Sequence, residues 1–170
     1  EAMTTLENAI KKIDSETREK LDITYKEVNK NFSEFFKRLF VGGKAELQLM
    51  GGEILDTGLQ VSAQPPGKKN TTINLLSGGE KALTAISLIF ALFKLNPSPF
   101  CVMDEVDAPL DDTNTGNFCS LVKEMAEKTQ FLIVTHNRIT MEIAEQLVGV
   151  TQQELGVSRI VEVDMRDIDD

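Results

Sequence analysis

The 170-residue sequence is poor in cysteine, and the two that it has, Cys101 and Cys119, lack the spacing of a metal-binding motif. Both lie in apolar or amphipathic surroundings. A disulfide framework is typical of small secreted domains with many cysteines, and nothing in this sequence follows that pattern. We therefore expect two reduced thiols that fill the core.

The sequence also lacks a long hydrophobic run and a secretory signal peptide. The longest apolar stretch extends from Ala82 to Leu95, and polar residues interrupt it at Thr84, Ser87 and Lys94. A transmembrane helix needs about 20 predominantly apolar residues, so this stretch is too short. We expect a soluble, cytoplasmic protein that does not interact with membranes.

Positive charge is scarce, because 18 Lys and Arg residues face 27 Asp and Glu residues and give a net charge of −9. Neutralising nucleic-acid phosphates requires clustered Lys and Arg, so the balance argues against general nucleic-acid binding by this chain alone. The adjacent pair Lys68 and Lys69 is expected in a solvated turn. The apolar content of 41% suits one globular unit with an extension.

A single helical stripe dominates the first forty residues. Apolar or tolerated residues recur every three or four positions from Met3 to Leu39, and no Gly or Pro interrupts before Gly42. Such a helix would be about 60 Å long. Its stripe requires a partner segment or chain, since each apolar side chain left in water forgoes about 1.5–3 kcal/mol of burial. Packing on its own domain is the alternative.

After the helix the pattern changes twice. Residues 45–49 and 59–63 alternate apolar and polar side chains, which predicts antiparallel strands with a turn at Gly51-Gly52. A turn-rich loop at 64–70 follows. From there we expect an α/β arrangement with a parallel sheet. Its predicted helices are 80–95, 112–128 and 139–147, its strands are 100–103 and 131–134, and two final strands lie near 148–152 and 157–163.

The string Ser77-Gly78-Gly79-Glu80 precedes the apolar run and has capping-box spacing. The glycines leave backbone amides uncovered, and a helix N-terminus with bare amides is suited to bind phosphate. An ordinary helix cap explains the same residues, so the string alone is weak evidence for a site.

An apolar strand ends in two adjacent carboxylates, Asp104 and Glu105. Ligands of α/β proteins bind at the carboxyl edge of the sheet, and in phosphoryl transfer an Asp at that edge holds Mg²⁺ while a neighbouring acid orients the attacking water. Further acids follow at Asp107, Asp111 and Asp112. An acidic loop without function would look similar, and Asp112 could simply cap the next helix.

His136, the only histidine, follows a second buried strand and therefore emerges at a comparable edge. With Ser77 and Asp104 it also occurs in the chain order of an α/β-hydrolase triad. The residues around Ser77 are not a Gly-x-Ser-x-Gly elbow, which argues against a hydrolase of that kind.

Together these strings resemble the C-terminal head segment of the structural maintenance of chromosomes (SMC) family within the ABC ATPases. They are LSGGEKALTA at 76–85, PFCVMDEVDAPLDD at 99–112 and the pair Thr135-His136. The string GVTQQELGVSR at 149–159 is similar to bacterial members. The resemblance implies an α/β fold that is the C-terminal part of an ABC-type head. Residues 1–41 would end a coiled-coil arm, and residues 42–170 would form the C-terminal lobe.

The resemblance also implies roles for particular residues. The signature motif, which contacts the γ-phosphate of ATP bound to the opposite head, would comprise Leu76, Ser77, Gly78, Gly79 and Glu80. Asp104 would lie near Mg²⁺ as the Walker B aspartate, Glu105 would polarise water, and His136 would be the switch histidine. The residues Leu110 and Asp111 would belong to the D-loop.

A complete ATPase also needs a phosphate-binding loop, and no Gly-x-x-x-x-Gly-Lys-[Ser/Thr] string occurs. The resemblance implies that the N-terminal half of the same head supplies it, so this chain alone would not turn over ATP. The other implied partners are a second head, a kleisin subunit, and DNA bound through the full assembly near the nucleoid. A DNA-repair ATPase with coiled-coil arms and a non-catalytic coiled-coil adaptor remain alternatives.

Overall fold

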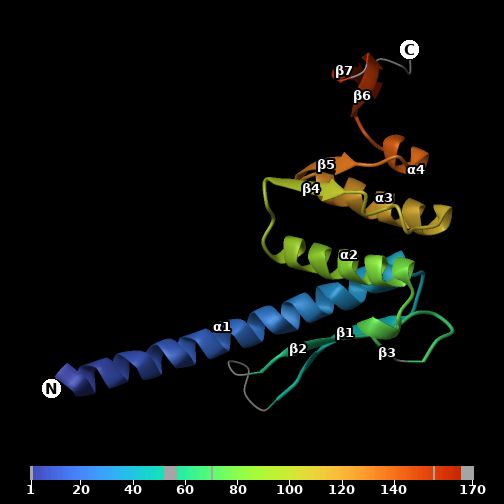
Figure 1. Cartoon of the computed structure of the whole chain (residues 1–170). Coiled ribbons are helices and arrows are strands. Elements are labelled where there is room, and N and C mark those ends of the chain that lie inside the picture. The colour runs from blue at the N-terminus through green and yellow to red at the C-terminus, as the bar shows by residue number, and fades with distance from the viewer. Residues whose placement is uncertain (1, 52–56, 70, 155, 166–170) are drawn as a thin grey trace. The chain divides into compact units, whose positions relative to one another are not determined.

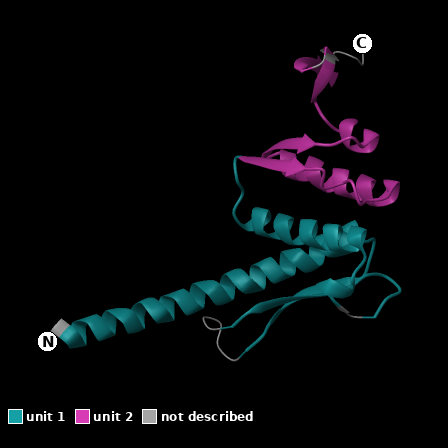
Figure 2. Cartoon of the chain, viewed as in Figure 1, with its two compact units in different colours: residues 1–99 teal, residues 100–170 magenta. Residues whose placement is uncertain are grey.

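The computed structural model describes residues 2–51, 57–69, 71–154 and 156–165. It divides into two compact units, residues 1–99 and residues 100–170 (Figure 2). The first contains α1 to α2, and the second contains β4 to β7 (Figure 1). The proposed division at residues 41 and 42 follows sequence motifs and differs from this division by packing, so it stays a prediction.

Helix α1 (Ala2–Leu39) is continuous over 38 residues. Its N-terminal part carries exposed apolar side chains at Met3, Leu6, Ile10 and Ile13. Its C-terminal part is buried and includes Phe32, which is fully inaccessible. The long helix predicted from apolar spacing is therefore confirmed, and only its last turns pack within the first unit.

The core of the first unit forms where α1 meets α2 (Gly78–Leu95). The ring centroid of Phe36 lies 6.3 Å from that of Phe32 in the same helix and 4.2 Å from that of Phe40, the residue that follows α1. Leu83 and Phe90 contribute buried side chains from α2. Such apolar and aromatic burial holds α2 against α1.

A small antiparallel sheet contacts the same end of α1 (Figure 1). It has the order β1 (Lys44–Leu49), β2 (Leu59–Gln64), β3 (Thr71–Thr72), and a short 3₁₀ helix, η1 (Ile73–Leu75), precedes α2. The two alternating strands predicted from sequence are confirmed by the pairing of β1 with β2. The predicted turn at Gly51-Gly52 lies partly outside the described residues, since Gly52 is not described.

The outer edge of β1 is held by α1. The Leu47 amide donates to Asn29 Oδ1 at 2.7 Å, and the Leu47 carbonyl accepts from the Tyr25 hydroxyl at 2.6 Å. An edge strand otherwise leaves such groups unpaired, so these bonds fix β1 against the helix. Gly43 makes the connection possible, because its φ is +76° and a Cβ there would lie 2.5 Å from the Gln64 carbonyl oxygen.

In the second unit, β4 (Phe100–Asp104) and β5 (Gln130–Val134) pair in parallel. The helix between them, α3 (Asp112–Ala126), buries Phe118, Leu121 and Val122. The opposite face of the strands leaves four apolar side chains exposed: Phe100, Val102, Leu132 and Val134. The two parallel strands therefore have one covered and one open face.

The end of the chain differs from the prediction. The helix expected over 139–147 is only one turn, α4 (Arg138–Met141), because β6 (Gln146–Glu154) begins at Gln146 and pairs antiparallel with β7 (Val157–Asp164). Pairing with β7 overrides the helical pattern of this segment. The predicted final strands are confirmed and are longer than expected, and the residue Leu155 of their predicted turn lies outside the described residues.

Cys119 is buried, as predicted, and burial raises the pKa of its thiol. Cys101 is half-buried, and burial raises the pKa of this thiol too. Both are therefore poor nucleophiles. Among the described residues, no helix is both long and apolar enough to cross a membrane.

Candidate functional site

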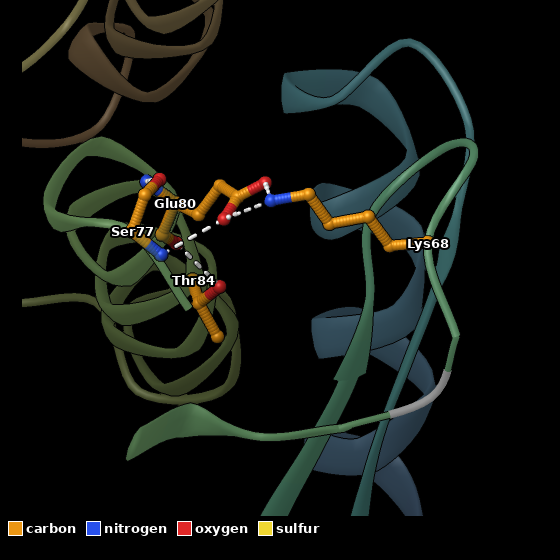
Figure 3. Close-up of polar contacts among 4 residues, drawn as sticks. All are labelled: Lys68, Ser77, Glu80 and Thr84. Carbon is orange, nitrogen blue, oxygen red and sulfur yellow. Dashed lines mark hydrogen bonds and ion pairs between the residues drawn. The ribbon is translucent and has the colours of Figure 1, made fainter. Parts of the chain in front are cut away.

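The N-terminus of α2 has the capping box predicted from its sequence. Ser77 Oγ accepts from the Glu80 amide at 3.4 Å, and the Ser77 amide donates to Glu80 Oε2 at 2.9 Å (Figure 3). Leu76 is buried and anchors the motif, whereas Ser77 and Gly78 are exposed. Nothing lies within 4 Å of the position that a Cβ on Gly78 would occupy. The exposed start of the helix is therefore open to an anion.

Lys68 is part of this motif in space, which the sequence analysis missed. Its Nζ lies 2.7 Å from Glu80 Oε1 and 3.0 Å from Oε2 (Figure 3). The solvated turn predicted for Lys68 and Lys69 is therefore also a tether between the loop after β2 and the start of α2. Twelve residues separate the two partners, and no sequence pattern signals such a contact.

The Glu80 carboxylate is consequently bound by groups of the protein itself. The ammonium group of Lys68, followed by the Ser77 amide, holds the pKa of Glu80 below its usual value. A carboxylate that is paired with Lys68 and bonded to the Ser77 amide shapes the loop around the exposed amides. It would repel a phosphate rather than bind one.

Replacing Lys68 by alanine is expected to lower the thermal unfolding midpoint by about 1–3 °C at pH 7, because exposed ion pairs contribute little. The folded-state pKa of Glu80 is depressed, so its contribution is present above the unfolded pKa and is lost as the pH falls through the folded pKa. The difference between wild type and Lys68→Ala should therefore shrink as the pH falls below the usual pKa of a glutamate, and it should disappear once the pH lies below the depressed folded-state pKa of Glu80.

Lys69→Ala is the matched control, because Lys69 is exposed and adjacent. Thermal unfolding of the three proteins across pH measures the effect. An equal loss in Lys69→Ala, or a Lys68→Ala effect that persists at low pH, would contradict the assigned ion pair.

The second group of candidate residues lies in the second unit, where the parallel register of β4 and β5 places the carboxyl ends of the two strands side by side. Asp104 pairs with Val134, and the Glu105 amide donates to the Val134 carbonyl at 2.8 Å. Glu105 has a φ of +47°, in the left-handed region that costs free energy for a non-glycine residue. The chain therefore turns sharply after Asp104, at the carboxyl edge of the strands.

His136 reaches the same edge from β5. Its Nδ1 lies 3.9 Å from Glu105 Oε1, and both side chains are mostly exposed. This distance exceeds the length of a hydrogen bond, so both groups can still bond to a ligand. Glu105 and His136 are thus neighbouring exposed groups that a ligand could reach, and Asp104, also exposed, ends the strand directly before Glu105.

The loop after Glu105 leads into α3. Asp111, rather than Asp112, is the N-cap, because Asp111 Oδ1 accepts from the Asn114 amide at 2.8 Å. Asp112 is the first helical residue. Leu110 is half-buried, and its amide donates to the Asp107 carbonyl at 3.0 Å. Leu110 and Asp111 are therefore fixed at the end of this loop.

Asp107 was not singled out by the sequence analysis among the acids of this loop. Its exposed fraction is 1%, and its Oδ2 accepts hydrogen bonds from the hydroxyls of Thr135 and Thr140. A buried carboxylate requires such partners. The run of acids in sequence gave no sign that one of them points inward.

The donors at the strand edge suit Mg²⁺. This ion keeps several waters and binds one or two carboxylates together with substrate phosphates, so the single exposed Asp104 is a fitting ligand. Among the described residues, no group of three or more His, Cys, Asp or Glu could hold a metal ion by itself. Any magnesium site here would thus depend on the nucleotide as a ligand.

Comparison with known proteins shows the family of the chain. Residues 5–159 match the family described as "RecF/RecN/SMC N terminal domain". The "Chromosome partition protein Smc" of Burkholderia pseudomallei is 66% identical over 164 residues, which cover 96% of this chain and 14% of that protein. The chain thus spans about one seventh of the length of such curated relatives.

Solved structures have the same fold. The Smc head domain of Pyrococcus furiosus with an extended coiled coil, bound to the C-terminal domain of ScpA, superposes with a TM-score of 0.91 at 36% identity, covering 97% of this chain and 42% of that one. A structure described as "ATP-driven dimerization and DNA stimulated activation of SMC ATPases" gives 0.76 at 38% identity, covering 85% and 88%. Because the family match covers most of its residues, the chain belongs to the RecF/RecN/SMC family.

Proposed function

We propose that this chain is the C-terminal half of the ATPase head of a chromosome-partition SMC protein. In this role it supplies a signature motif, a Walker B edge and a switch histidine to ATP sites shared by two heads. The observation that carries the proposal is the cluster at the ends of β4 and β5, where Glu105 Oε1 and His136 Nδ1 are 3.9 Å apart beside Asp104.

The proposed roles follow from this geometry. Asp104, at the end of β4, would bind Mg²⁺ together with the phosphates, and the ion would neutralise charge that develops on them. Glu105 would orient and polarise the attacking water, because its carboxylate is exposed on a fixed turn. His136 would hydrogen-bond the γ-phosphate from the same edge. Catalysis would be positional and electrostatic, without a covalent intermediate.

The start of α2 would act on the ATP of the opposite head. The Ser77 hydroxyl and the amides of Gly78 and Gly79 would contact the γ-phosphate, and Leu76 and Glu80 would hold the turn. Leu110 and Asp111 would form the D-loop. The open space at Gly78 supports this assignment, and the capping box bonds the amides of Ser77 and Glu80 without using those of Gly78 and Gly79.

The missing phosphate loop would come from the N-terminal half of the head. The open face of β4 and β5 is a suitable docking surface, because Val102 and Leu132, each 59% exposed, are neighbours on the two strands. A third strand or a covering layer would bury such side chains for about 1.5–3 kcal/mol each. The exposed stripe of α1 would likewise pair with the other strand of a coiled-coil arm.

The pair β6 and β7 would bind a kleisin subunit. The Pyrococcus furiosus head is described as bound to the C-terminal domain of ScpA, and a second head structure is bound to the winged-helix domain of ScpA. Val150 and Ile160 face each other across the two strands, and each is 70% exposed. Such a pair is a natural anchor for a partner.

Replacing Ile160 by aspartate is expected to weaken binding of the kleisin C-terminal domain at least about tenfold, because a buried apolar contact is replaced by a charge. Isothermal titration with the complete head measures the dissociation constant. Thr113→Asp, an exposed site on α3 with the same charge change, is the control. Wild-type affinity in Ile160→Asp would exclude this surface as the kleisin site.

DNA would be bound by the full assembly, because this chain alone is acidic. That assembly would lie in the cytoplasm near the nucleoid. A DNA-repair ATPase within the same family is the nearest alternative, and the name of the curated relatives favours chromosome partition. A non-catalytic coiled-coil adaptor predicts no effect of nucleotide on assembly.

The test of the half-head is assembly with the N-terminal head segment of the same full-length protein. Size-exclusion chromatography with light scattering should detect a one-to-one complex that binds ATP with Mg²⁺ and dimerises when ATP is bound. Val102→Asp on the open face should prevent the complex, and Thr113→Asp should not. A complex that forms but ignores nucleotide would favour the adaptor.

A further inference from the structure

Asp107 is a buried carboxylate that the proposed mechanism does not use. It follows Glu105 by two residues, its side chain is 1% exposed, and it lies in the loop between β4 and α3. Burying an ionised group costs free energy unless hydrogen bonds compensate. The buried Asp107 carboxylate therefore needs hydrogen-bond donors within the protein.

Those partners come from the segment that carries the histidine. Thr135 Oγ1 donates to Asp107 Oδ2 at 2.6 Å, and Thr140 Oγ1 in α4 donates to the same oxygen. Thr135 immediately precedes His136. Hydrogen bonds to a charged acceptor are about twice as strong as neutral ones. A single carboxylate oxygen thus joins the loop after β4 to the loop after β5.

The hydrogen bonds continue on the far side of His136. Thr135 Oγ1 accepts from the Asn137 amide at 3.0 Å, and Asn137 Oδ1 accepts from the Ile139 amide at 2.9 Å. The residues before and after His136 are therefore fixed, while the His136 side chain itself is 75% exposed. These hydrogen bonds fix the residues on both sides of His136 and involve neither imidazole nitrogen.

We propose that Asp107 is a positioning residue that holds Glu105 and His136 together through the hydroxyls of Thr135 and Thr140. The inference rests on the proposed ATPase function and adds the device that sets the geometry of its site. Burial alone does not require this network, because replacing both partners of a buried hydrogen bond by apolar groups can be nearly neutral for stability.

The test measures kcat and KM for ATP in the complete head with Thr135→Val, Thr135→Ser and Ser87→Ala. Valine keeps the shape of threonine and removes the hydroxyl, and serine retains it. Ser87 also carries a buried hydroxyl, which donates to the Leu83 carbonyl in α2, away from this network. It is the control for loss of one buried hydrogen bond.

Thr135→Val is expected to lower kcat at least about tenfold with KM changed less than about threefold, because a misplacement of about 1 Å can cost about 100-fold in rate. Thr135→Ser should recover kcat to within about threefold of wild type, and Ser87→Ala should retain it. Wild-type kcat in Thr135→Val, or a loss in Thr135→Ser as large as in Thr135→Val, would overturn the proposal.

Asp107→Asn keeps the test decisive if Thr135→Val does not fold. It preserves shape and weakens both bonds, so kcat should fall while ATP binding persists, and an unchanged kcat in the folded variant would overturn the proposal. Hydrolysis by wild type that is lost in Glu105→Gln would show that the proposed site is active. If wild type does not hydrolyse ATP, the proposed function fails; if it does and the Thr135 variants match it, only this inference fails.

Discussion

ATP turnover by the complete head is expected to fall at least about 100-fold when Glu105 is replaced by glutamine. Glutamine has nearly the same size as glutamate, so the turn and the hydrogen bond from the backbone amide of residue 105 to the Val134 carbonyl should survive. The change removes the carboxylate whose Oε1 lies 3.9 Å from His136 Nδ1 and which would polarise the attacking water. ATP binding and pairing of heads should persist, because neither depends on this carboxylate. Single-turnover hydrolysis and light scattering measure the two properties separately.

Asp112→Asn is the matched control for this variant. Asp112 is an exposed acid of the same region but occupies the first turn of α3, outside the proposed cluster. Turnover should stay within about twofold of wild type. If Glu105→Gln retained most activity, or if both variants lost it equally, water activation by Glu105 would be excluded.

Replacing Ser77 by arginine is expected to abolish ATP-driven pairing of two heads and to reduce turnover at least about 100-fold. The arginine side chain would cover the exposed amides at the start of α2. The change also removes the Oγ that accepts from the Glu80 amide, which costs about 1 kcal/mol of stability. That cost is small beside the loss of a phosphate site, so the variant should fold and still bind ATP.

The control for Ser77→Arg places the same charge on another exposed serine. Ser120 lies on the surface of α3, and its hydroxyl donates to the Gly116 carbonyl of the same helix. Ser120→Arg should pair with ATP as wild type does. If heads carrying Ser77→Arg still paired with ATP, the proposed signature role of α2 would be wrong.

Local patterns predicted much of the fold. The stripe from Met3 to Leu39 gave a continuous helix, because nothing in that stretch breaks the period. The capping box at Ser77 and Glu80 followed from spacing alone, and both of its bonds form. These features depend on neighbours three or four residues away, which a sequence displays directly.

Contacts between distant segments were harder to predict. Gln146 and Leu147 have a helical pattern, yet they pair with β7, whose competing register was not visible in their own sequence. The ion pair of Lys68 with Glu80 joins residues on two different elements. Long-range pairing decided both outcomes.

The sequence proposed members of the candidate site, whose roles stay a prediction, but it did not give their geometry. Asp104, Glu105 and His136 were proposed from two strand ends, and the short distance between Glu105 and His136 depends on the parallel register of β4 with β5. Among the neighbouring acids, the sequence could not distinguish buried Asp107 from exposed Asp112. That difference arises from two threonine hydroxyls that lie 28 and 33 residues further along the chain.

The most direct test of the half-head is ATP turnover by this chain mixed with the N-terminal head segment of its own protein. We predict no turnover by either part alone, and Mg²⁺-dependent turnover on mixing that is lost in both Ser77→Arg and Glu105→Gln. Sustained hydrolysis by this chain alone, or no hydrolysis by a mixture that demonstrably assembles, would contradict the account.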